Sequence, residues 1–166
     1  MRPTAAQMAA ALGLQPHAEG GFYLETYRAA QTLRTPRGER PAATAILFLV
    51  TAESASRLHR LTSDELWVYQ GGLPLELVTI APGGELQRRV LGDFEGEALL
   101  PQALVPAGSW QGARLAGGPH LPAELAWALV SCVVTPGFDF ADFELGDREE
   151  LLAEHPEHAA LILALT

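Results

Sequence analysis

The stretch SRLHRLTSDELWVYQGG, residues 56–72, decides the fold that we predict for this chain of 166 residues. Polar and apolar residues alternate on both sides of a turn at residues 62–64, and two glycines end the second run. Such alternation is typical of β-strands, because every second side chain of a strand lies on the same face. We therefore expect a hairpin in which His59 and Glu65 face each other and point into a barrel.

An imidazole and a carboxylate inside an apolar barrel cost free energy unless they are matched, hydrogen-bonded or bound to a ligand. This cost makes His59 and Glu65 candidate catalytic residues, with the imidazole as general base and the carboxylate orienting it. The alternative is a hydrogen-bonded polar pair without a catalytic role at the mouth of the barrel.

Upstream of this stretch, the sequence predicts a short helix, a strand, a loop and a buried strand. Thr4 is a suitable N-cap for a helix over Ala5–Leu12. Residues 22–28 alternate as in a strand with two dissimilar faces, and the polar residues 31–41 indicate a mobile loop. The continuous apolar run at residues 43–50 is typical of a strand that is buried on both faces.

The downstream half contains predicted strands separated by Gly/Pro turns, followed by helical spacing. We expect strands over residues 73–80 and 85–92, a second hairpin over 103–115, a long strand ending by Pro136, and two short helices or one kinked helix over 148–165. Eight or more short strands between terminal helices predict a mainly β chain, folded as an antiparallel sandwich or barrel. We expect one domain, with an N-terminal helix in residues 1–15, a barrel in 16–145 and a helical segment in 146–166.

The composition indicates a folded chain that acts on small molecules. Hydrophobic residues make up 48% of the chain and charged residues 19%, which is ordinary for a globular domain. The net charge of −9 makes nucleic acid and anionic membrane surfaces poor partners. The lone cysteine, Cys132, lies in an apolar run and is expected to be a buried, inert thiol. The first residues do not form a signal peptide, so we expect a cytoplasmic protein.

Four segments together resemble the cupin superfamily, and more narrowly its RmlC-like Cupin_5 branch. A strand with a histidine precedes a strand with a glutamate that ends in glycine, and a Pro-x-Gly turn follows later. The resemblance implies a double-stranded β-helix, a jelly-roll barrel with short N- and C-terminal helices. The segments are EGGFYLETYR (19–28), TAILFLVTAESASRLHRLTSDELWVYQGG (44–72), VPAGSWQGARL (105–115) and VTPGFDFADFEL (134–145).

In the general cupin pattern, two histidines and a glutamate of a first motif and a histidine of a second motif bind a divalent metal. The resemblance carries these positions to Arg57, His59, Glu65 and Gln111, so two of the four ligands are replaced. A guanidinium disfavours a nearby cation, and an amide oxygen is a weaker ligand than imidazole. The cofactor is therefore left unknown: proton abstraction requires none, and a weak divalent-metal site of His59, Glu65 and Gln111 is the alternative.

Polar residues close to the predicted pair are candidates for ligand contacts. Ser56 and Gln111 offer hydrogen bonds inside the cavity. Arg57 has a planar fork that suits a carboxylate, and an ion pair with Asp64 or Glu65 is the alternative for its guanidinium.

Aromatic residues on the same strands have two possible roles. Trp67, Tyr69 and Trp110 either line a pocket that stacks on a ring or sugar, or belong to the core. Tyr23 and Glu25 share a strand face, and they are expected to reach the barrel mouth or a dimer partner.

For the remaining histidines and for an aromatic segment near the C-terminus, we predict structural or surface positions and no role in the site. We expect the aromatic residues of FDFADFEL, residues 138–145, to close one end of the barrel rather than to form a binding loop. Solvated surface positions are expected for four histidines that lie in loops or at a helix break: His17, His120, His155 and His158.

These observations favour a small polar ligand held in the barrel. They do not decide whether the protein converts this ligand or only binds it. One hypothesis is a metal-independent isomerase, epimerase or lyase, in which His59 is the base and Arg57 and Gln111 fix the substrate. The others are a non-catalytic ligand-binding cupin and a metal-dependent cupin enzyme. By resemblance we also expect a homodimer, to which residues 22–28 contribute.

Overall fold

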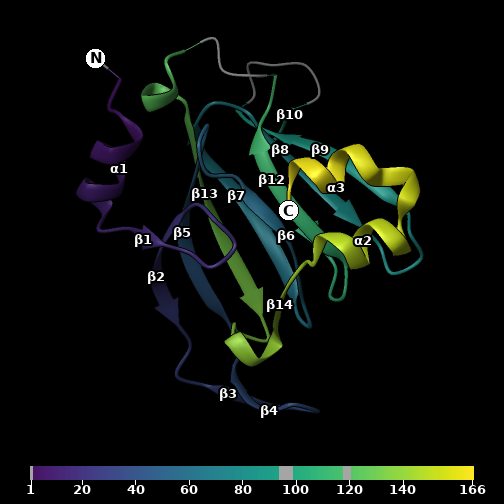
Figure 1. The fold of residues 1–166 in the computed structure, drawn as a ribbon. Coiled ribbons are helices and arrows are strands. Elements are labelled where there is room, and N and C mark those ends of the chain that lie inside the picture. The colour runs from purple at the N-terminus through teal and green to yellow at the C-terminus, as the bar shows by residue number, and fades with distance from the viewer. Residues whose placement is uncertain (1, 94–98, 118–120) are drawn as a thin grey trace.

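The structure is a computed structural model that describes residues 2–93, 99–117 and 121–166, and in these residues two six-stranded sheets face each other (Figure 1). All sheet neighbours are antiparallel except β9 and β10. This arrangement confirms the predicted mainly β jelly roll. The first sheet has the spatial order β1 (Gln15–Pro16), β2 (Phe22–Arg28), β5 (Thr44–Thr51), β13 (Trp127–Thr135), β7 (Asp64–Gly72) and β11 (Gln102–Val105). The second has the order β10 (Leu99–Leu100), β9 (Leu86–Leu91), β8 (Leu75–Ile80), β12 (Trp110–Leu115), β6 (Ser56–Leu61) and β14 (Phe143–Leu145).

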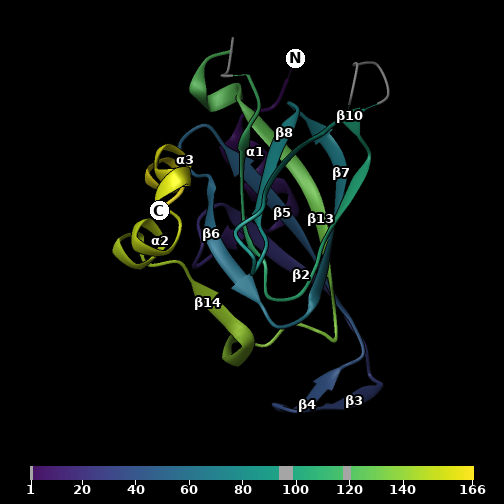
Figure 2. The same ribbon diagram turned by 90° about the vertical axis from the view of Figure 1, so that its right-hand side faces the viewer.

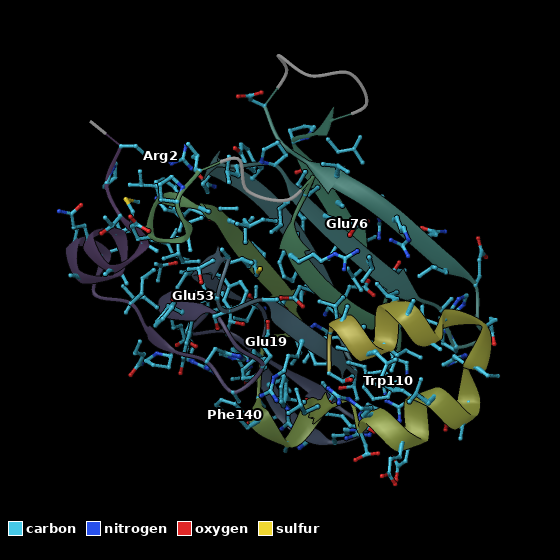
Figure 3. The ribbon with its side chains drawn as sticks, turned by 45° about the horizontal axis from the view of Figure 1, so that its top comes forward. Arg2, Glu19, Glu53, Glu76, Trp110 and Phe140 are labelled. Carbon is cyan, nitrogen blue, oxygen red and sulfur yellow. The ribbon has the colours of Figure 1, made fainter. Side chains whose placement is uncertain are left out.

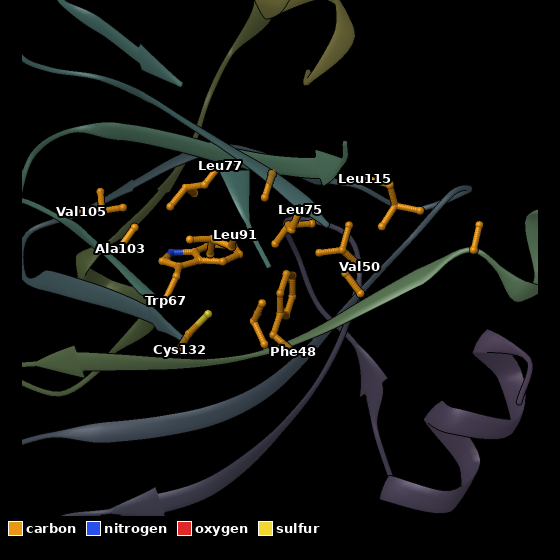
Figure 4. Packing of buried hydrophobic residues seen from close by; sticks show 14 residues of the cluster. Phe48, Val50, Trp67, Leu75, Leu77, Leu91, Ala103, Val105, Leu115 and Cys132 are labelled. Carbon is orange, nitrogen blue, oxygen red and sulfur yellow. The ribbon is translucent and has the colours of Figure 1, made fainter. Parts of the chain in front are cut away.

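Alternation along the strands places a continuous apolar core between the two sheets (Figure 4). Phe48 of β5 and Trp67 of β7 are its largest side chains, and their rings meet edge to face at 5.9 Å. Along β13 the inward side chains run from Val130 in this core to Cys132 and Val134, which line a cavity. The core therefore fills one part of the barrel and leaves the other part open.

The C-terminal helices cover the outer face of the second sheet (Figure 2). Leu58 and Trp110 of this sheet pack against Leu161 and Ile162, and Asp147 caps the helix that precedes them. Pro156 interrupts the helical segment as predicted, because it cannot continue the hydrogen-bonding pattern. The helices and 3-10 turns are α1 (Ala5–Leu12), η1 (Ala123–Leu125), η2 (Phe140–Asp142), α2 (Arg148–Glu154), η3 (Pro156–His158) and α3 (Ala159–Ala164).

The predicted N-terminal helix is present with the expected ends. Thr4 and Gln7 form a capping box at the start of α1, and Gly13 ends the helix in the left-handed conformation. Among the described residues, no helix is long and apolar enough to cross a membrane.

Three local predictions were wrong. Strands β6 and β7 do not pair as a hairpin, because the turn at residues 62–63 carries the chain from one sheet to the other. Strands β11 and β12 likewise belong to different sheets, so residues 103–115 form a corner. The expected loop at residues 31–41 is a two-stranded hairpin of β3 (Thr32–Thr35) and β4 (Gly38–Pro41), which projects from the barrel (Figure 1). Its strands pair with each other and so satisfy their backbone groups without the main sheets.

Candidate functional site

A cavity of about 500 Å³ opens between the two sheets. Its size is within the range of small-molecule sites, and its lining mixes apolar walls with a few convergent polar groups. The inner end contains Glu19, His59 and Glu65, which come from three different parts of the chain. The other lining residues are Gln15, His17, Tyr23, Leu24, Glu25, Arg28, Thr44, Ile46, Phe48, Leu61, Cys132, Val134, Phe138, Asp139 and Phe140.

Glu19 reaches the cavity from the connection between β1 and β2 (Figure 3). A tight turn holds this connection, because the His17 carbonyl accepts from the Gly20 amide and the Gly21 carbonyl accepts from the His17 amide, both at 3.1 Å. Glu19 is 6% exposed, and its side-chain atom Oε1 accepts a hydrogen bond from the Ser56 hydroxyl at 2.7 Å. Its second oxygen, Oε2, faces His59 at 3.2 Å.

The His59 imidazole is 2% exposed and has a polar partner at each nitrogen. Nδ1 lies 2.8 Å from the Arg57 carbonyl oxygen, which can only accept, so Nδ1 carries a hydrogen. In the neutral ring, Nε2 is then the acceptor, and its neighbour is Glu19 Oε2. A proton on Glu19 Oε2 is therefore placed to be shared with the imidazole.

Burial favours the neutral forms of both Glu19 and His59, so the proton stays with this pair of groups. Burial raises the pKa of Glu19 to about 8, although the Ser56 hydrogen bond and the Arg57 charge oppose the shift. Burial also lowers the pKa of His59, against the opposing effects of Glu65 and the Arg57 carbonyl. Both shifts favour neutral groups, since the low-polarity interior disfavours an unmatched charge.

Glu65 approaches the same cavity from the opposite sheet, where a chain of hydrogen bonds holds it. The Trp67 indole donates to Gln111 Oε1 at 2.9 Å, and Gln111 Nε2 donates to Glu65 Oε2 at 2.5 Å. The indole is a donor only, so it fixes which end of the Gln111 amide turns toward Glu65. Burial raises the pKa of Glu65 to about 7, and it raises the pKa of the neighbouring Cys132 thiol as well.

The rim of the cavity is aromatic and acidic. The ring of His17 stacks on Phe140 at 6.2 Å and meets Tyr23 edge to face at 4.7 Å. Burial lowers the pKa of His17 to about 4, and the nearby His59 contributes to the shift. Arg28 donates to both carboxylate oxygens of Glu25, at 2.9 and 2.7 Å.

The structure brings several predicted site residues together. His59, Glu65, Tyr23 and Glu25 all line the cavity. Ser56 and Gln111 do not line it, but each donates a hydrogen bond to one of its carboxyl groups. The aromatic segment at residues 138–145 contributes Phe138, Asp139 and Phe140 to the rim, so it bounds the cavity as well as packing at the barrel end.

Other predicted ligand contacts lie elsewhere. Arg57 is exposed. Its guanidinium donates to the carbonyls of Ala18 and Glu19 at 2.6 and 3.2 Å, in place of the predicted ion pair with Asp64 or Glu65. Trp67 is part of the apolar core, and Tyr69 packs against that core while donating to the Gly72 carbonyl. Trp110 lies under the C-terminal helices outside the barrel (Figure 3), because Gln111 takes the inward position of β12.

The histidine predictions also require correction. His17 lines the cavity and is surrounded by aromatic rings, instead of lying in solvent. The His155 and His158 side chains are 12% and 14% exposed, because they pack beside Gly84 and Glu157 at the helix break. His120 lies outside the described residues.

Sequence reasoning missed Glu19, His17 and Arg28. The available signal was HAEGG, in which an imidazole and a carboxylate precede two glycines that permit a tight turn. Nothing in that segment alone places it against β6, which lies some forty residues later in the chain. Glu19, and not Glu65, is the carboxyl group that contacts the His59 ring.

The predicted metal ligands do not fit a divalent cation. Both ends of the Gln111 amide are occupied by Trp67 and Glu65, and the Arg57 guanidinium, itself a cation, donates to the Ala18 carbonyl. Among the described residues, no group of three His, Cys, Asp or Glu side chains is placed to hold a metal ion.

Gly20 gives a direct test of how the Glu19 turn is built. It has φ +104°, and a Cβ atom at this position would fall on the Ala55 carbonyl oxygen. Gly20→Ala is expected to lower the free energy of unfolding by about 2 kcal/mol, because backbone strain and a backbone clash combine. Urea denaturation measures the loss. Gly83→Ala is the control, since its Cβ meets nothing within 4 Å, and equal stability of the two variants would contradict the expectation.

Comparisons with known sequences find a family model and a curated relative. The family model described as Cupin superfamily (DUF985), Cupin_5, matches residues 6–146. The uncharacterized protein YML079W of Saccharomyces cerevisiae is 28% identical over 158 residues, which cover 87% of this chain and 77% of the yeast protein.

Solved structures show the same likeness over nearly the whole chain. A hypothetical protein from Leishmania major has a TM-score of 0.89 at 38% identity, covering 98% of each chain. Protein SO0799 from Shewanella oneidensis has a TM-score of 0.87 at 37% identity, covering 98% of this chain and 97% of that chain. Oxalate decarboxylase from Bacillus subtilis has a TM-score of 0.55 at 14% identity, covering 91% of this chain and 36% of that chain; this likeness concerns the fold alone.

Proposed function

The chain belongs to the Cupin_5 (DUF985) family of the cupin superfamily, and from this premise we propose that it binds a small polar molecule in its barrel and transfers protons on it. The reaction class is isomerisation, epimerisation or elimination without a metal. One observation carries the proposal. Three buried ionisable groups, Glu19, His59 and Glu65, meet at the inner end of an open cavity. Their burial costs free energy that apolar residues would not cost, and such perturbed groups cluster at functional sites.

The two walls of the cavity supply complementary roles. On one wall, His59 Nε2 and Glu19 Oε2 lie 3.2 Å apart and are placed to share a proton, so this pair releases that proton to a substrate. On the opposite wall, Glu65 has a pKa of about 7, so near neutral pH a large fraction is ionised and accepts a proton. A proton then leaves the substrate toward one wall while another arrives from the other wall. The Arg57 carbonyl and the Gln111 amide are positioning groups that orient His59 and Glu65.

Deuterium exchange tests this function before the substrate is identified. The protein is incubated in heavy water with a panel of small amino and hydroxy carbonyl compounds, and NMR follows deuterium incorporation next to each carbonyl. His59→Asn and Glu65→Gln are each expected to slow the exchange about 100-fold or more, the usual contribution of a general acid or base. His155→Asn and Glu154→Gln are the matched controls outside the cavity and are expected to retain full exchange.

The same experiment separates catalysis from binding alone. If compounds bind to the wild-type protein but none of them takes up deuterium, a non-catalytic binding cupin is favoured. Exchange that persists in both cavity variants contradicts the roles given to His59 and Glu65. The homodimer stays a prediction, and β2 would contribute to it through its exposed half, Glu25–Arg28.

A further inference from the structure

The cavity has an excess of acidic groups. Among the described residues that line it, Glu19, Glu25, Glu65 and Asp139 are acids and Arg28 is the one permanent cation. The Arg28 guanidinium already forms a bidentate ion pair with Glu25. Glu65 and Glu19 at the inner end have no such ion pair, and Asp139 at the rim interacts with Arg28 and Arg40 only through a longer-range attraction.

Aromatic rings surround the space between these acids. Tyr23, Phe48, Phe138 and Phe140 line the cavity, together with the imidazole of His17. Phe140 is 58% exposed at the rim, and its ring lies 5.0 Å from that of Phe138. The faces of aromatic rings carry partial negative charge and attract cations, most strongly where water is displaced.

We infer that the cavity takes a small organic cation, such as a protonated or quaternary amine, rather than an anion or a neutral sugar. The inference rests on the proposed function and specifies the charge of its ligand. Aromatic walls with carboxyl groups at both ends form a site that complements a positive charge on an organic body. An anion would meet Asp139 at the entrance and Glu65 at the inner end, and among the described lining residues the one permanent cation, Arg28, is already paired with Glu25.

The inner carboxyl groups strengthen this complementarity once a ligand is present. The groups around Glu65 are those of His59, Glu19, Gln111 and Cys132. None of them carries a permanent positive charge, because burial favours the neutral form of the imidazole. A bound cation supplies the missing charge and allows the carboxyl groups to ionise. A neutral ligand of the same shape supplies no such charge and gains only packing and dispersion contacts.

Thermal shift and calorimetric titration with isosteric pairs test the inference. The probes are choline, butylammonium and methylguanidinium, each with a neutral compound in which carbon or oxygen replaces the charged nitrogen, and simple carboxylates as anions. At least one cation is expected to raise the melting temperature and to bind about tenfold more tightly than its neutral partner. The inference is overturned if no cation exceeds its neutral partner, including the case in which none of the cations binds.

Two variants connect that preference to the cavity. Phe140→Leu changes an exposed ring, so the fold is retained, and it is expected to weaken cation binding about fivefold and neutral binding by a smaller factor. Glu65→Gln is expected to reduce the cation preference, and Glu154→Gln, an equal loss of charge on exposed α2, is expected to keep it. Equal binding of neutral and charged probes overturns the ligand class alone, because the proton-transfer function has its own test in deuterium exchange.

Discussion

Replacing Gln111 by Leu is expected to lower the free energy of unfolding by about 3 kcal/mol, the largest effect of a single polar substitution in this barrel. The variant removes the acceptor of the Trp67 indole and the donor to Glu65 at the same time. Both partners are buried, at 1% and 5% exposure, so water cannot replace the lost hydrogen bonds. Each unsatisfied buried group costs about 1–3 kcal/mol. Urea denaturation at constant pH measures the loss.

A double-mutant cycle isolates the hydrogen bonds from the packing. Trp67→Phe combined with Gln111→Leu is expected to cost less than the sum of the two single variants, because the indole donor is removed together with its acceptor. Additive losses would show that the indole and the amide do not depend on each other. In that case the proposed orientation of Glu65 through Gln111 would also be contradicted.

The protein is expected to lose about 2 kcal/mol of stability between pH 6.5 and pH 8. The pKa values of Glu19 and Glu65 are raised to about 8 and about 7, so the folded state keeps protons that the unfolded state has already released. Stability contributed by such groups falls as the pH rises toward the folded pKa, by about 1.4 kcal/mol per proton and pH unit. Denaturation at a series of pH values measures the slope.

The histidines change stability in a different pH range. The pKa values of His17 and His59 are lowered by burial, so the unfolded state binds the extra protons below pH 6.5 and stability falls as the pH drops. Above about pH 7.5 the unfolded histidines have lost their protons as well, and the slope then comes mainly from the carboxyl groups. Glu19→Gln keeps the shape and hydrogen-bonding capacity of the side chain and is expected to remove most of the fall above pH 7. Glu154→Gln is expected to keep it, and a flat wild-type profile would contradict the assignment.

The sequence determined most of the secondary structure outside residues 31–41 and the inward direction of two site residues. The helix over Ala5–Leu12 follows from local capping groups, and the strand that ends before Pro136 follows from a ring that cannot continue a ladder. Strand alternation placed His59 and Glu65 on inward faces, because side chains of a strand point to its two sides in turn. These properties depend on neighbours within a few residues, so a single sequence contains them.

Only the tertiary structure decided which elements meet. Strand periodicity is the same for a paired hairpin and for a turn that crosses between sheets, so the sequence could not show that β6 and β7 lie in opposite sheets. It also could not place Glu19 beside His59, or assign Trp110 to the outer face and His17 to the cavity. Such contacts join residues far apart in the chain, and their free energy comes from the packing of the whole barrel. The sequence therefore predicted some of the residues of the site. The contact between Glu19 and His59 and the full set of cavity residues depend on how the two sheets pack together.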